Sequence, residues 1–134
     1  MGLRLWNTGA AGILAILAGC GPTTPQVDTS DPAVAALMAE TPEKYAASAD
    51  IARRIAAQCS RYAYDAGRKQ ALDAVRQSQG MIAPNRGGFD LELDVSERVF
   101  LARNNLSSFN EDLCLAGDAE ESRASSIAAL LVPV

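Results

Sequence analysis

The stretch from Pro42 to Gln79, PEKYAASADIARRIAAQCSRYAYDAGRKQALDAVRQSQ, decides the fold class. It is rich in Ala, Arg and Gln, which favour helix. Its apolar residues recur at helical spacing, at Ile51, Ile55, Cys59, Tyr62 and Ala66, and Leu72 and Val75 continue a similar face. The pattern predicts a long helix that begins at the Thr41-Pro42-Glu43 start signal, ends near Gly80 and has a bending point at Gly67.

A shorter helix is predicted just before this stretch, over residues 33–40. Asp31-Pro32 places a capping side chain before a proline at the first helical position. Pro42 separates this helix from the long one, because proline does not fit inside a helix.

The residues after Gly80 are harder to assign. Residues 81–88 contain Pro, Asn and paired Gly, which indicates a loop. Over 89–95 apolar and polar residues alternate as in a strand, yet the same residues also fit a helical face. We favour helix because a lone strand would leave its backbone groups unpaired. Asp94 with Glu97 resembles a capping box at the start of that helix.

A turn at residues 107–110 and a last helix over 111–131, with Gly117 as its weak point, complete the expected elements. We therefore expect an all-α fold, a small bundle of three to four helices in a single domain over residues 31–134.

The first twenty residues carry an export signal. Arg4 precedes a ten-residue apolar run at residues 9–18, which is too short to span a bilayer of about 20 helical residues. The following Leu17-Ala18-Gly19-Cys20 resembles the lipobox of bacterial lipoproteins. The resemblance implies a signal peptide at 1–19, cleavage before Cys20, and a diacylglyceryl group and an N-acyl chain (palmitate or similar) on that cysteine.

Residues 20–30 are expected to form a lipidated, flexible tether, since they contain two prolines and several turn formers. Two or three acyl chains hold a protein firmly at a membrane. The residue after the cysteine is Gly21 rather than the Asp that favours inner-membrane retention in enteric-type sorting. We therefore expect a lipid-anchored protein on the periplasmic face, with the outer membrane favoured over the inner.

Cys59 and Cys114 remain once Cys20 is lipidated. The exported part of the chain enters an oxidising compartment, where two remaining thiols make one bond. We therefore predict a disulfide that joins Cys59 to Cys114 and pins the helical domain; two buried free thiols are the alternative.

Charge is unevenly distributed along the chain. Residues 44–86 carry a net charge of +5 and residues 87–134 a net charge of −6. Attraction between the rims of neighbouring helices would explain this division. A stripe that binds an anionic partner is the sharper hypothesis, and its candidate residues are Arg53, Arg54, Arg61, Arg68, Lys69 and Arg76.

Composition excludes several functions. The 134 residues include no histidine, which removes His-based triads and His metal sites, and the net charge of −4 argues against nucleic-acid binding. Asp90-x-Glu92-x-Asp94 lacks the glycine of a calcium loop. We expect no catalysis, with a small hydrolase as a distant alternative, and no metal or cofactor beyond the lipid.

A second resemblance covers the C-terminal third. Asp112-Leu113-Cys114, Gly117, Glu120-Glu121, Ser126-Ile127 and Leu130-Leu131 look like the ending of a family of short secreted bacterial helical proteins of uncharacterised function. That resemblance implies a disulfide-pinned helical fold. Two functions are then carried forward: a helical interaction module in an envelope assembly with a protein partner, or a lipoprotein that binds a small ligand or inhibits a cell-wall enzyme.

Overall fold

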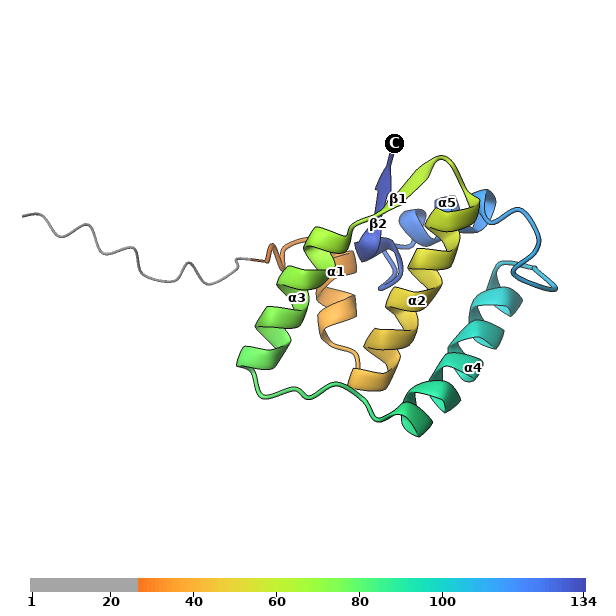
Figure 1. Cartoon of the computed structure of the whole chain (residues 1–134). Helices are drawn as coiled ribbons and strands as arrows, with labels where there is room; N and C mark the ends of the chain where they lie inside the picture. The colour runs from red at the N-terminus through yellow and green to blue at the C-terminus, as the bar shows by residue number, and fades with distance from the viewer. Residues whose placement is uncertain (1–26) are drawn as a thin grey trace, which may run out of the picture.

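Helix α2 (Pro42–Gln58) lies at the centre of the protein, in a computed structural model that describes residues 27–134. Helices α1 (Pro32–Met38) and α3 (Ala66–Ser78) lie on one side of α2, and α4 (Arg86–Arg103) lies along the other side (Figure 1). Cys20, the predicted signal peptide and most of the predicted tether fall outside the described residues.

The C-terminal part of the chain closes one end of this arrangement. It contains α5 (Cys114–Ser122), a short 3-10 helix (Ala128–Leu130) and strand β2 (Leu131–Pro133). Leu113, Leu130 and Leu131 are buried there and join the core formed by Ile51 and Ile55 of α2.

The fold is mostly helical but not purely all-α. The described residues contain five α-helices, where three to four were expected, and a two-stranded antiparallel sheet. Strand β1 (Tyr62–Tyr64) pairs with β2, with Ala63 opposite Val132. The predicted bundle is therefore correct as a small helical fold and wrong in omitting the sheet.

The predicted long helix is interrupted by β1. Cys59 ends α2 in an extended conformation, and Asp65 begins α3 by accepting a hydrogen bond from the Arg68 backbone N–H at 2.8 Å. The break therefore lies at residues 59–65 and not at Gly67, which sits in the first turn of α3. The break forms because the C-terminal residues supply a strand partner for Tyr62–Tyr64, which helical spacing alone does not reveal.

Helix α4 confirms the helical interpretation of residues 89–95. Its cap is Asn85, whose side chain accepts a hydrogen bond from the Gly88 N–H at 2.8 Å, so the helix begins nine residues before the expected capping box at Asp94. Asp94 lies instead in the middle of the helix and forms an ion pair with Arg98.

The last predicted helix, over 111–131, is much shorter than expected. Helix α5 ends at Ser122 because Ala124 adopts a left-handed conformation with φ of 47°. The chain then turns into the 3-10 helix and β2, which places Leu131 opposite Tyr64.

The predicted disulfide is confirmed. Cys59 and Cys114 are bonded, with their Cα atoms 5.1 Å apart. The bond ties the first residue after α2 to the first residue of α5, so it holds the C-terminal part of the chain against the end of α2.

Candidate functional site

The six candidate residues of the basic stripe come from two helices and the turn between them, and each contacts a group of this same chain. Arg54 bridges to Asp50 of its own helix and to Glu97 of α4 at 2.7 Å, and its guanidinium lies 4.9 Å from the centre of the Phe109 ring. Arg61 pairs with Asp118 of α5 at 2.9 Å. These two pairs join the basic half of the sequence to the acidic half.

The other four members contact nearby groups. Arg53 pairs with Asp50, and Arg68 donates to the Ala129 carbonyl at 2.8 Å. Lys69 pairs with Asp73 at 2.7 Å. Arg76 is 4% exposed and donates to the carbonyls of Met38 and Glu40, each at 3.1 Å. Arg76 therefore fastens α3 to the turn between α1 and α2.

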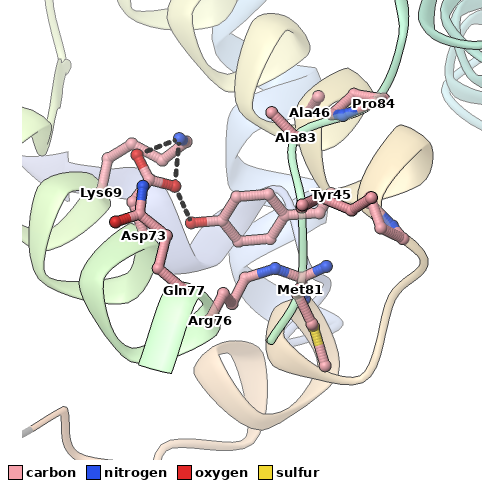
Figure 2. A pocket seen from close by; sticks show the side chains of 11 residues that line it. Tyr45, Ala46, Lys69, Asp73, Arg76, Gln77, Met81, Ala83 and Pro84 are labelled. Carbon is pink, nitrogen blue, oxygen red and sulfur yellow. Dashed lines mark hydrogen bonds and ion pairs between the residues drawn. The ribbon is translucent and has the colours of Figure 1, made fainter. Parts of the chain in front are cut away.

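A cleft of about 250 Å³ lies where α2, α3 and the loop after α3 meet. Figure 2 shows the Tyr45 ring reaching from α2 toward Asp73 and Lys69 of α3, with Arg76 beside the ring. The Tyr45 hydroxyl donates to Asp73 at 2.8 Å, and the guanidinium of Arg76 lies 4.2 Å from the ring centre. The outer wall of the cleft is the apolar segment 81–84.

Burial, together with the hydrogen bond to Asp73, raises the pKa of Tyr45 well above its ordinary value. The hydroxyl is therefore a neutral hydrogen-bond donor at physiological pH. Tyr45 is 5% exposed, and Arg76 and Lys69 are both engaged inside the protein, so the cleft offers mainly its apolar wall rather than a free cation. Such a lining suits a small, largely apolar molecule.

A second hollow, of about 170 Å³, lies between α2 and α4. At its floor Ser48 donates to the Glu40 carboxylate at 2.8 Å and lies 3.2 Å from the Ser126 hydroxyl. Burial raises the pKa of Glu40, and its two serine partners lower it in part. Val95 and Val99 of α4 form the rim of this hollow.

The solvent-exposed side of α4, from its outer face to the rim of this hollow, carries an apolar row that the sequence pattern did not reveal. Leu91, Val95 and Val99 are 69%, 46% and 53% exposed. They are spaced four residues apart, so they share one face of the helix, while Phe100 is fully buried on the opposite face. We call Leu91, Val95 and Val99 the α4 outer row.

The signal for this row was the alternation at 89–95. The face of the helix that packs on the core uses only some of the apolar residues in 89–95. Phe89 and Leu93 are partly buried on that inner side. Leu91 therefore points away from α2, whereas Val95 and Val99 border the hollow between α2 and α4. A helix with apolar residues on two faces packs only one of them on its own core, so the other face stays exposed.

Searches with this chain matched no protein-family model, no curated protein and no solved structure. Among residues 27–134, none of the helices has the length and apolar character needed to cross a membrane. Within the same residues, no group of three or more acidic or cysteine side chains is arranged to hold a metal ion.

Proposed function

We propose that this chain is a lipid-anchored helical interaction module on the periplasmic face of the envelope, an accessory or scaffold subunit without catalysis of its own. The observation that carries the proposal is the α4 outer row. Scattered exposed apolar residues are ordinary on a protein surface, whereas three in register along one helix favour a protein contact.

The position of the row supports the same proposal. Val27, the first described residue, packs near Val34 of α1 and lines a hollow with Gly67 of α3. It thus lies on the opposite side of α2 from α4 (Figure 1). A chain anchored through Cys20 would enter the domain at that side, and the α4 outer row would face away from the point of entry.

The anchor is tested with Cys20→Ala in the full-length chain. We expect an unprocessed precursor that no longer fractionates with the outer membrane. A variant that keeps the size and the membrane fraction of the wild type would contradict the lipoprotein proposal.

The interaction is tested by crosslinking intact cells and purifying a C-terminally tagged chain from solubilised envelopes. We expect one protein at near-stoichiometric yield with the wild type and its loss with Val95→Asp. Leu115→Asp is the matched control, because Leu115 is 72% exposed on α5, away from the row. Equal recovery from all three chains would refute the role of the row.

The cleft beside Tyr45 supports the second candidate, a lipoprotein that binds a small ligand. Ala46 lines this cleft, and Ala46→Trp would fill it. A compound that raises the melting temperature of the wild type and not of Ala46→Trp would establish this function, and a compound that stabilises both chains equally would bind elsewhere.

A further inference from the structure

We infer that the partner of the α4 outer row is a second copy of this chain, packed antiparallel with its two-fold axis at Val95. The inference rests on the proposed function and names the partner of that surface. It is argued from the register and the charges along α4.

The apolar row is symmetric about its centre. Leu91 lies four residues before Val95 and Val99 four residues after it. With a rise of about 1.5 Å per residue, a two-fold axis at Val95 places Leu91 of one copy level with Val99 of the other. The two copies of Val95 meet on the axis. A row with apolar groups spaced four residues apart is the ridge used in the commonest helix packing, at a crossing angle of about −50°.

The charges beside the row are also complementary under this symmetry. Asp94 lies beside the row just before its centre, and Arg98 lies on the same flank after the centre; Asp94 and Arg98 are 53% and 74% exposed. Antiparallel pairing about Val95 puts Arg98 of one copy beside Asp94 of the other, about 3 Å from it along the axis.

The antiparallel dimer adds charge pairs between the two copies without removing an ion pair that stabilises the fold. The ion pair of Asp94 with Arg98 is exposed and lies within one helix, so it contributes little to stability. Arg98 can therefore contact the second copy, whereas Glu97 is held by Arg54 of α2 at 2.7 Å. Complementary charges beside the contact fix the register and the orientation of the two helices.

The contact area predicts weak association that needs the membrane. Helix α4 has 18 residues and is about 27 Å long, so one helix face falls short of the roughly 800 Å² per partner of a standard interface. Anchoring both copies to one surface raises their effective concentration. The dimer should therefore be abundant on membranes and sparse in dilute detergent solution.

Cysteine pairing in the envelope of producing cells tests the inference on the full-length chain. We expect Val95→Cys to form a disulfide-linked dimer on non-reducing gels. Two differently tagged copies, one with Leu91→Cys and one with Val99→Cys, should also link. Leu91→Cys alone should not, because its two copies are about 12 Å apart along the axis, beyond the roughly 7 Å limit between bonded Cα atoms.

Three controls accompany the measurement. The wild type reports any linking through its native cysteines, and Leu115→Cys reports random collision of an exposed site. Adding Arg98→Glu to Val95→Cys should reduce the dimer several-fold, because Glu then faces Asp94 of the other copy. Arg86→Glu, the same charge change about 14 Å from the axis, should leave the dimer unchanged.

Linking of Leu91→Cys alone and Val99→Cys alone, without the mixed pair, would overturn the antiparallel arrangement. Linking no greater than that of Leu115→Cys at every site would overturn self-association. If the wild type then co-purifies with a different protein and the Val95→Asp chain does not, the proposed function stands and this inference is refuted. If the Val95→Asp chain co-purifies with the same proteins as the wild type, both the proposed function and this inference are refuted.

Discussion

Gly117 should tolerate no side chain, although it lies inside helix α5. An added Cβ would lie 2.6 Å from Cε2 of Tyr62 and 3.2 Å from Cγ2 of Ile55. Tyr62 has little freedom to move away, because its hydroxyl donates to Asp118 at 2.8 Å and its backbone pairs with Pro133. Gly117→Ala must therefore displace a buried ring, the sheet or α5 itself.

The expected change in the free energy of unfolding combines one stabilising effect with two destabilising effects. Replacing glycine by alanine inside a helix gains about 1 kcal/mol in helix propensity. Overpacking a core costs about 1–3 kcal/mol, and losing the hydrogen bond to the Asp118 carboxylate costs about 1.5–3 kcal/mol more if the ring moves. When the ring moves, these terms sum to a fall of about 1.5–5 kcal/mol in the free energy of unfolding, and a domain of this size loses about 4–8 °C in melting temperature per kcal/mol.

Thermal and urea unfolding, followed by circular dichroism, measures this effect, with Gly67→Ala as the matched control. An added Cβ at Gly67 would meet only the Asp65 Oδ1 atom, at 3.6 Å, an ordinary contact. That variant should be as stable as the wild type or more stable by up to about 1 kcal/mol. The two glycine-to-alanine changes should therefore act in opposite directions.

A stable Gly117→Ala protein would refute the packing of Tyr62 against α5. A double-mutant comparison sharpens the test: in a Tyr62→Ala background, Gly117→Ala should lose most of its cost, because the ring is gone and only the 3.2 Å contact with Ile55 remains. If the cost of Gly117→Ala is the same in both backgrounds, the cause lies elsewhere in α5.

Three further predictions concern stability. Replacing Cys59 and Cys114 by alanine should lower the free energy of unfolding by about 4 kcal/mol in denaturant titrations, since the bond closes a 55-residue separation; an unchanged midpoint would contradict this. Glu120 is fully buried and bonded to Arg103 at 2.6 Å, so Glu120→Ala should cost about 3 kcal/mol, and a loss below about 1 kcal/mol would show the pair to be dispensable. The raised pKa of Glu40 means that the folded chain keeps a proton that the unfolded chain has lost, so stability falls as pH rises above about 4.5. Glu40→Gln removes this loss, and its melting temperature should gain on the wild type as the pH rises above about 4.5; a constant difference would contradict the assignment.

The helix ends explain much of what the sequence could and could not predict. Helices α3, α4 and α5 are each followed, two positions after their last residue, by a residue with positive φ, namely Gly80, Asn105 and Ala124. In each case the next N–H bonds back to a carbonyl five residues earlier, at 2.9–3.2 Å. Glycine marks such an end in a sequence, and Gly80 was correctly predicted. Alanine does not, which is why the last helix was predicted too long.

Strand β1 was unpredictable for a different reason. Tyr62 and Ala66 continue the helical spacing of α2, and the residues that pair with β1 lie about 70 positions later in the chain. The local signal that would have helped is Asp65, which caps α3. Gly117 was likewise misread as a weak point, because its close approach to Tyr62 depends on that sheet.

The disulfide was predictable because it follows from cysteine number and compartment rather than from fine geometry. The charge division also had a physical basis, since Arg54 and Arg61 reach Glu97 and Asp118 in the acidic half. The α4 outer row was not recognised, although the alternation at 89–95 contained it. Excess apolar residues in a helix whose core face is already complete were the overlooked signal.

Photocrosslinking in intact cells is the most direct test of the central claim that the α4 outer row is a docking surface. A photoreactive residue is placed in turn at Leu91, Val95 and Val99, with Leu115 as the exposed control outside the row. We predict covalent adducts of one defined mass from all three positions of the row and none of that mass from Leu115. Irradiated chains that remain single at all three positions would contradict the account.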